Sequence, residues 1–149
     1  GTTFYFTIAL KTQSEALLNA YGSDATESKK TVILIVEDEE INYLYLEEVL
    51  LSIDVNILHA RSGYEAVEIF NKHPEIELIL MDIKLEGMDG YETTKIIRKQ
   101  NKQVPIIAQT AYAMYDDKQR AIEAGCNDFI AKPIRKAELL EKIEALDIF

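Results

Sequence analysis

The alternation of short apolar runs with amphipathic segments restricts the fold of this chain more than any other feature. From Thr31 onward, each of five apolar or β-branched runs precedes a segment whose apolar residues recur at helical spacing. The runs are 31–36, 55–60, 76–81, 104–109 and 128–132, and the helical segments are 39–52, 62–73, 90–100, 115–125 and 135–146. Five such βα units predict an α/β fold, with a doubly wound parallel sheet, helices on both faces and right-handed crossovers.

Residues that typically begin or end helices and strands support these boundaries. Ser62 is suited to cap the start of the second helix, and Gly125 is suited to close the fourth. Pro105 falls near the start of the fourth strand, where a missing N–H group is tolerated.

The chain before Thr31 has a different character. Residues 1–11, "GTTFYFTIALK", alternate in the manner of a single β-strand, whereas residues 22–30 have the polar composition of a linker. We therefore expect three parts: an isolated strand at 1–11, a connector at 12–30 and a domain at 31–149. An apolar strand with free edges does not stay solvated. We expect it to be disordered, to pack on the domain surface or to pair weakly with a second copy.

Composition excludes several functions. The formal net charge is −10, and because acidic and basic residues cancel over 1–30, the excess lies in 31–149 and opposes nucleic-acid binding. One cysteine and two histidines provide neither a disulfide nor a clustered zinc site. No run has the length of a membrane span, and no signal peptide is recognisable. We expect a cytoplasmic chain without direct membrane insertion, leaving open a membrane anchor in a longer parent protein.

Chemically useful side chains follow four of the five predicted strands. Glu37 and Asp38 follow the first strand, Asp82 the third and Thr110 the fourth, and Lys132 ends the fifth. Functional groups in open α/β sheets gather at the carboxyl ends of the strands. The sequence therefore predicts one site at this edge.

Neighbouring carboxylates at this edge favour a hard divalent cation. Like charges a few ångström apart raise each other's pKa unless a cation intervenes, and Mg²⁺ suits a site with few protein ligands. We expect Asp38 and Asp82 to bind the metal directly and Glu37 to act through a bound water. Such a site suits phosphoryl transfer to Asp82, with Lys132 and Thr110 contacting the remaining phosphoryl oxygens.

Four segments, "ILIVEDEE", "LILMDIKLEGMDGYE", "PIIAQTAYAM" and "AGCNDFIAKPI", resemble the receiver domain of two-component response regulators, in family order from about 32 to 146. The resemblance implies the flavodoxin-like (βα)₅ fold with strand order 2-1-3-4-5. It implies that Asp82 is the phosphoacceptor for a phosphohistidine donor, which is a histidine kinase core or a histidine phosphotransfer domain. It also implies that Glu37 and Asp38 bind Mg²⁺ and that the backbone carbonyl of Lys84 is a further metal ligand.

The same resemblance implies a conformational switch. Thr110 and Lys132 match the family's hydroxyl and lysine, and Phe129 matches an aromatic position that turns inward when the hydroxyl moves toward the phosphoryl group. Two departures concern loop rigidity and output. The loop after Asp82 reads 85–87 "LEG", where many relatives have proline before the glycine, and phenylalanine replaces the commoner tyrosine at 129.

The segment "GTTFYFTIAL" resembles the closing strand of a histidine-kinase ATP-binding domain. This shorter likeness implies that the chain is the C-terminal part of a hybrid sensor histidine kinase. The fragment itself would then be a phosphoacceptor with self-phosphorylation and autodephosphorylation activity, while its parent would be the kinase.

Two alternatives use the same architecture. An aspartate-nucleophile phosphohydrolase needs a second aspartate two residues after the nucleophile, where this chain has Lys84. A flavin- or nucleotide-binding module needs a phosphate cradle after the first strand, where "EDEE" would repel phosphate. A histidine phosphotransfer role is disfavoured because His59 ends a strand and His73 precedes Pro74.

Overall fold

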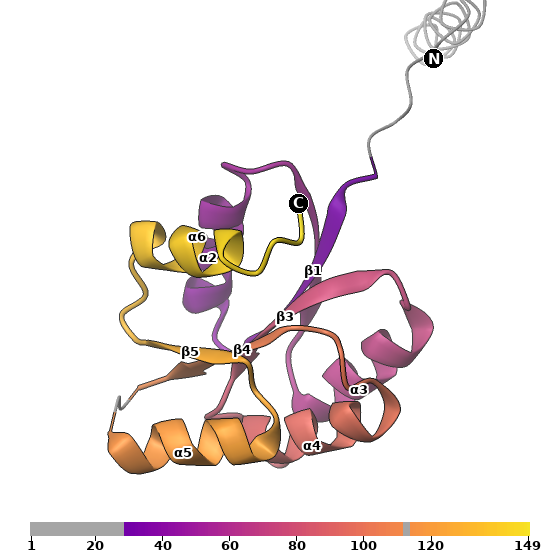
Figure 1. Ribbon diagram of the computed structural model, residues 1–149, viewed down its shortest axis with the longest axis vertical. Coiled ribbons are helices and arrows are strands. Elements are labelled where there is room, and N and C mark those ends of the chain that lie inside the picture. Colours follow the sequence, from indigo (N-terminus) through magenta and orange to yellow (C-terminus); the bar gives the residue numbers. More distant parts are fainter. Residues whose placement is uncertain (1–28, 112–113) are drawn as a thin grey trace, which may run out of the picture.

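The predicted parallel sheet is present in the computed structural model, which describes residues 29–111 and 114–149 (Figure 1). Its strands are β1 (Thr31–Val36), β2 (Val55–Ala60), β3 (Ile76–Asp82), β4 (Ile106–Thr110) and β5 (Asp128–Ala131). Its helices are α2 (Glu40–Leu50), α3 (Gly63–Lys72), α4 (Gly90–Gln100), α5 (Tyr115–Ala124) and α6 (Lys136–Glu144). All strand pairs are parallel and the order is β2-β1-β3-β4-β5, which confirms the flavodoxin-like (βα)₅ prediction.

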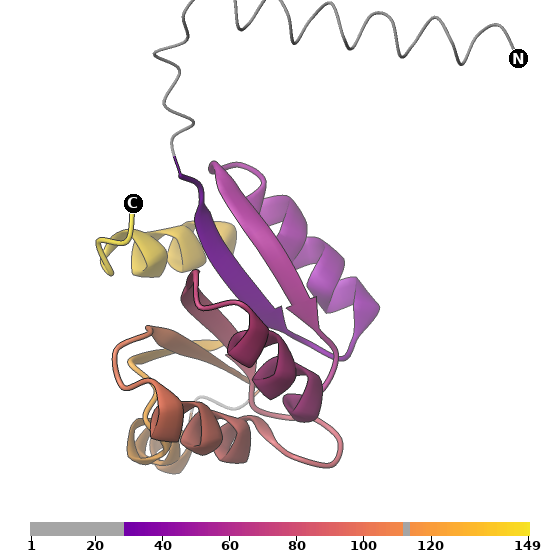
Figure 2. The same cartoon turned by 90° about the vertical axis from the view of Figure 1, so that its right-hand side faces the viewer.

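Helices cover both faces of the sheet. Helices α2 and α6 lie on one face, and α3, α4 and α5 lie on the other (Figures 1 and 2). Successive residues of a strand point to opposite faces. In β1, Ile33 and Ile35 accordingly join the cluster beneath α2 and α6, while Leu34 and Val36 join the cluster beneath the other three helices. The core is thus split by the sheet, and β1 is buried along its whole length.

Local signals place the element ends close to their predicted positions. The hydroxyl of Ser62 accepts a hydrogen bond of 3.1 Å from the Glu65 amide, so it caps α3 as expected. Gly125 ends α5 in the left-handed conformation at φ 111°. Strand β4 begins at Ile106 rather than 104, because Pro105 has no N–H to donate and contributes its carbonyl, which accepts from the Ile79 amide at 3.0 Å.

The loop after β3 needs glycine for two separate reasons. Gly87 adopts a positive φ of 76°, which side chains rarely tolerate. Gly90 packs so tightly on the preceding chain that an added Cβ would collide with the backbone carbonyl of Asp82. Its amide also donates to the Ile83 carbonyl at 2.9 Å. These contacts fix the start of α4 against the backbone that carries Asp82.

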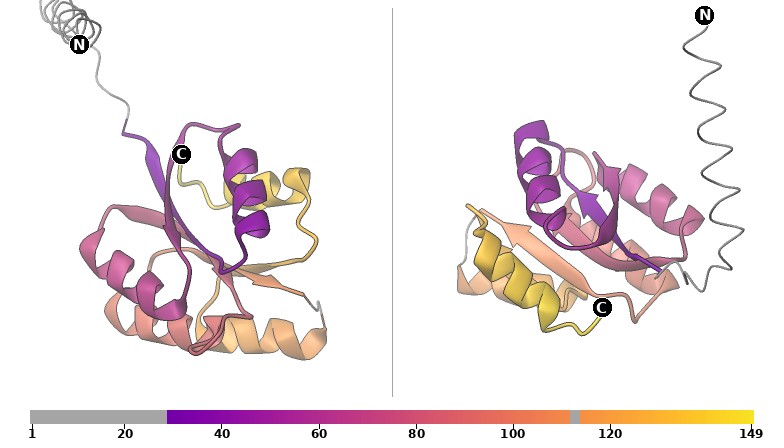
Figure 3. Two further views of the ribbon diagram at one scale, coloured as in Figure 1. Left: turned by 180° about the vertical axis from the view of Figure 1, so that it is seen from behind. Right: turned by 90° about the horizontal axis from the view of Figure 1, so that it is seen from above.

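Both ends of the described domain lie at one pole, opposite the carboxyl ends of the strands (Figures 1 and 3). Lys30 pairs with Asp54 at 2.8 Å, and the Thr31 hydroxyl donates to the Ile148 carbonyl at 3.2 Å. The predicted strand at 1–11, and all of the predicted connector except Lys29 and Lys30, lie outside the described residues. Within the described part of the chain, no helix combines the length and apolar character needed to cross a bilayer.

Candidate functional site

Adjacent strands place three polar side chains in a row on the sheet face that packs under α2 and α6. Glu37 directly follows β1, Asp82 ends β3 and Gln109 lies in β4 opposite Asp82 in the strand register. In each strand the residue two positions earlier belongs to the hydrophobic cluster beneath α2 and α6. Because side chains alternate along a strand, the next polar residue continues on that face. The row therefore forms the floor of the site at the carboxyl edge.

Three carboxylates converge at this edge. One oxygen from each of Glu37, Asp38 and Asp82 lies within 4.8 Å of the others. Glu37 and Asp82 are buried, whereas Asp38 is exposed. The two predicted positions after β1 and the one after β3 are thus brought together as expected. Oxygen ligands from a few carboxylates, with one open side for water, are the donor set that Mg²⁺ favours.

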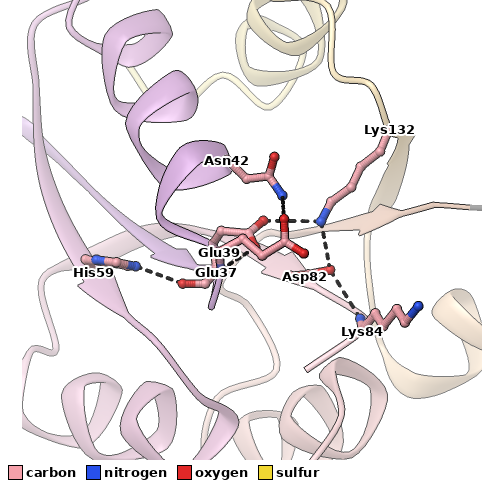
Figure 4. Close-up of polar contacts among 7 residues, drawn as sticks. All are labelled: Glu37, Glu39, Asn42, His59, Asp82, Lys84 and Lys132. Carbon is pink, nitrogen blue, oxygen red and sulfur yellow. Dashed lines mark hydrogen bonds and ion pairs between the residues drawn. The ribbon is translucent and has the colours of Figure 1, made fainter. Parts of the chain in front are cut away.

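Lys132 bridges two of these carboxylates (Figure 4). Its Nζ lies 3.2 Å from Oε2 of Glu37 and 3.2 Å from Oδ1 of Asp82. Burial opposes the charged ammonium, but the attraction of Asp82 and Glu37 outweighs it and raises the pKa of Lys132. Lys132, which directly follows β5, therefore stays protonated beside Asp82.

Both buried carboxyl groups have raised pKa values. Burial, reinforced by the nearby Asp82 charge, raises the pKa of Glu37 to about 7. Burial also raises the pKa of Asp82, although Lys132 and the Lys84 amide act in the opposite direction. A single ammonium thus compensates the pair only in part. A bound cation would relieve the remaining electrostatic cost.

A small network orients Glu37. Its Oε1 accepts a hydrogen bond of 3.1 Å from the Glu39 amide, and its backbone carbonyl lies 2.9 Å from Nε2 of His59 (Figure 4). The His59 ring stacks on Tyr43 with 3.6 Å between ring centroids. Sequence reasoning missed this role of His59, because the contact joins two strands across a register that no local pattern reveals.

The remaining predicted residues surround this cluster. The Lys84 amide donates to Asp82 Oδ1 at 3.2 Å, while its ammonium points away from Asp82 (Figure 4). Thr110 is buried at the end of β4, and its carbonyl accepts from the Lys132 amide at 2.8 Å. Phe129 is set apart on β5, half-buried, with Lys118 Nζ 4.7 Å and Lys142 Nζ 5.6 Å from its ring centroid.

Comparison with known proteins agrees with this geometry. Residues 33–144 match the family described as the response regulator receiver domain. The chain belongs to this family. As a receiver domain, it is a module of two-component signalling.

Individual relatives of this receiver domain are moderately similar. The polar-differentiation response regulator DivK of Brucella ovis is 35% identical over 115 residues, covering 76% of this chain and 93% of DivK. The receiver domain of the sensor histidine kinase PA1611 from Pseudomonas aeruginosa PAO1, which has a magnesium ion in its active-site cleft, is 36% identical, with a TM-score of 0.73 and coverage of 78% and 97%.

A third relative was crystallised with a partner. The structure joins the Saccharomyces cerevisiae histidine phosphotransfer signalling protein Ypd1 with the receiver domain of its downstream response regulator Ssk1. The match is 35% identical, with a TM-score of 0.71, and covers 76% of this chain and 86% of the matched chain.

Gln109 is the second residue of this receiver domain that sequence reasoning missed. Its side chain is 0% exposed, and within the described residues neither its amide oxygen nor its amide nitrogen has a hydrogen-bond partner. A polar residue that interrupts an otherwise apolar strand, "PIIAQT", was the available signal. Buried polar groups are nearly always paired, so an unpaired amide beside Asp82 calls for a physical reason.

Proposed function

We propose that this receiver domain takes a phosphoryl group from phosphohistidine onto Asp82, with Mg²⁺ as the cofactor, and changes conformation in response. The observation that carries this proposal is the convergence of three carboxylates within 4.8 Å, with Lys132 bridging Glu37 and Asp82 at 3.2 Å. Excess negative charge beside one fixed ammonium suits a centre that binds a cation and then a phosphoryl group.

The donor set fits a magnesium ion. Asp38 and Asp82 would supply direct carboxylate ligands, and the Lys84 backbone carbonyl a further one. The buried Glu37 would act through a bound water. When bound, Mg²⁺ would neutralise the acidic cluster and the charge that develops on the transferring phosphoryl group. The magnesium reported for the PA1611 receiver domain supports this choice of ion.

The side chains of this domain would then perform the transfer. The Asp82 carboxylate attacks phosphorus, a P–O bond forms, the P–N bond to the donor imidazole breaks, and the imidazole leaves as its ring nitrogen takes a proton. Lys132, already at 3.2 Å from Asp82, compensates charge on one phosphoryl oxygen. The Thr110 hydroxyl, at the end of the neighbouring strand, contacts another.

A protein donor suits the surface beside this site. Ile41 is 82% exposed and Leu44 51% exposed on α2, and Ile41 lines the same cavity as Lys132. Apolar side chains at the rim of a reaction site favour contact with another protein over a free metabolite. The complex of Ypd1 with the Ssk1 receiver domain supports a histidine phosphotransfer protein as one class of donor.

The conformational response would run from Thr110 to Phe129. Residue 110 pairs with Ala131 in the β4–β5 register, so a shift of the Thr110 hydroxyl toward a phosphoryl group disturbs the strand that carries Phe129. The half-buried Phe129 ring would then turn inward. The face formed by α5 and β5 would report the phosphorylated state to the next component.

Acetyl phosphate with Mg²⁺ tests the proposal directly. The wild-type chain should gain one acid-stable, base-labile phosphoryl group, as measured by intact-protein mass spectrometry. The Asp82→Asn variant should gain none, while the exposed Asp116→Asn should behave as wild type. Labelling of Asp82→Asn at the wild-type level would show that another residue is the acceptor.

A further inference from the structure

Gln109 occupies a position directly beside the acceptor. It is the register partner of Asp82 on the adjacent strand, and both side chains lie on the sheet face under α2 and α6. Facing residues of neighbouring strands have Cβ atoms about 5 Å apart. The Gln109 amide therefore stands one strand spacing from the carboxylate that we propose is phosphorylated.

Lys132 shares a cavity with this amide. The cavity has a volume of about 440 Å³ and lies between α2 and the segment that follows β5. Its lining combines apolar side chains, such as Ile41 and Leu46, with the polar groups of Asn42, Tyr45, Gln109 and Lys132. Gln109 thus lies beside Asp82 and lines the same cavity as Lys132, although its side chain is hydrogen-bonded to neither.

Stability alone does not account for a glutamine at this position. A buried amide without partners destabilises a fold relative to an apolar residue of similar shape, because it loses its hydrogen bonds to water. The residue two positions earlier on the same face, Ile107, is fully buried and apolar. Local choices that weaken a fold are concentrated at functional sites.

Lys132 needs a new partner during the reaction. An ammonium has three donors, and in this structure two of them point at Glu37 and Asp82. Both carboxylates belong to the acidic cluster, whose oxygens would be engaged by Mg²⁺ and by the phosphoryl group. The ammonium would then exchange carboxylate oxygens for one phosphoryl oxygen, and its other donors would need an acceptor at the moment when its position matters most.

We propose that Gln109 is a positioning residue for Lys132. Its side-chain carbonyl accepts a hydrogen bond from the ammonium once Asp82 is metal-bound and phosphorylated, and this bond holds the lysine against a phosphoryl oxygen. The Gln109 amide, which has no hydrogen-bond partner among the described residues, supplies this acceptor. This inference rests on the proposed function, because it assumes phosphorylation of Asp82.

The test compares Gln109→Leu with wild type and with Gln100→Leu, which makes the same change at an exposed position on α4. Gln109→Leu should be phosphorylated by acetyl phosphate about tenfold more slowly, the loss expected from one hydrogen bond to a charged group. Its Tm should rise by about 3 °C, because an unpaired buried amide has been removed. Gln100→Leu should keep the wild-type rate.

Lysine ammonium NMR supplies a readout that a structural role would not move. With Mg²⁺ and beryllofluoride, which mimics the phosphoryl group, ¹⁵N-lysine-labelled protein should show a slowly exchanging ammonium signal. Its absence in Lys132→Ala assigns it to Lys132. Gln109→Leu should lose or strongly shift this signal.

The outcomes separate the two proposals. If wild type is not labelled on Asp82, the proposed function is wrong. If wild type is labelled and Gln109→Leu reacts at the same rate, the role of Gln109 is disproved, and ordered water is then a sufficient partner for its amide. A slower variant with an unchanged Lys132 signal also overturns the inference. Slower reaction together with a lost signal supports it, and a raised Tm excludes damage to the fold as the cause.

Discussion

The ammonium of Lys132 lies 3.2 Å from a carboxylate oxygen of Asp82, and it reaches the acidic cluster from the strand at the far edge of the sheet. The same ammonium contacts Glu37, so it neutralises part of the charge that a divalent cation would neutralise. In the proposed reaction, lysine and metal would act together on the phosphoryl group, yet both are attracted to the same carboxylates. This relationship yields the first prediction.

Lys132→Met should bind Mg²⁺ more tightly than wild type, by about tenfold, because removing a neighbouring positive charge removes repulsion of about 1–2 kcal/mol. The same variant should lose most phosphorylation. Calorimetric titration with Mg²⁺ measures the affinity. Lys142→Met is the matched control, since Lys142 pairs with Asp128 and should leave Mg²⁺ binding unchanged. Weaker metal binding in Lys132→Met would mean that the lysine organises the carboxylates more than it repels the ion.

Glu37 makes metal-free stability depend on pH. Its pKa of about 7 in the fold exceeds the ordinary value of 4.5, so between these values the folded state binds more protons than the unfolded chain. The contribution of Glu37 is therefore greatest below pH 4.5 and is lost as the pH rises toward 7. Relative to Glu37→Gln, wild type should lose up to about 3 kcal/mol of unfolding free energy over this window.

Denaturant titrations in EDTA, from about pH 5 to about pH 8, measure this difference. Comparison with Glu37→Gln cancels the exposed carboxylates, whose contributions the two proteins share. Mg²⁺ should flatten the dependence because it favours the ionised form, and its own affinity should rise with pH through the same range. A difference that stays constant with pH would place the pKa of Glu37 near its ordinary value.

Gly90→Ala should be markedly destabilising. The new methyl group meets the Asp82 carbonyl at the start of α4, and relief requires movement of backbone on both sides. We expect a loss of about 2 kcal/mol together with slower phosphorylation, because Asp82, the proposed acceptor, shifts with its own carbonyl. Gly87→Ala, strained only by its φ of 76°, should cost about 1 kcal/mol. Urea titrations measure the unfolding free energy of both variants. Equal losses would show that backbone conformation alone, and not the contact with the Asp82 carbonyl, requires glycine at position 90.

Lys118→Met should weaken the placement of Phe129. The ammonium lies 4.7 Å from the ring centroid, a contact worth about 0.5–1 kcal/mol at a partly exposed site. The variant should lose about that much stability, and with less to hold the ring in place the beryllofluoride-bound form should show more of the inward conformer in aromatic NMR spectra. The exposed Lys95→Met on α4 is the control. An unchanged population of the inward conformer would show that the Lys118 ammonium does not influence the position of the Phe129 ring.

Most of the fold was predictable because the apolar periodicity and the capping residues indicate the same element boundaries. Strand β1 at 31–36 and helix α4 at 90–100 have their predicted bounds, and the capping by Ser62 was read directly from the chain. Strand β4 starts two residues later than predicted, since proline removes a ladder donor at the position where pairing would begin. The convergence of the acidic residues followed from topology alone, because carboxyl ends of parallel strands share one edge.

The sequence alone did not reveal which groups each side chain contacts. Nothing in the chain pairs His59 with the Glu37 carbonyl, and nothing places Lys118 from α5 against Phe129 of β5. Gln109 carried a signal, as a polar residue within an apolar strand, but only burial and the register with Asp82 make it meaningful. Such relationships depend on the three-dimensional register and on rotamers, which lie beyond local pattern.

The bond from the Thr31 hydroxyl to the Ile148 carbonyl brings the first strand and the final residues together at the pole opposite the carboxyl ends of the strands (Figure 3). A domain built in this way can be joined to many different protein neighbours. Covalent neighbours can be joined at either end, or the whole unit inserted within a host loop, without covering the edge at which we propose that a phosphodonor approaches. The geometry thus allows the same reaction centre to be recombined among many signalling architectures, with linkers free to diverge at one pole while the chemistry at the other stays fixed.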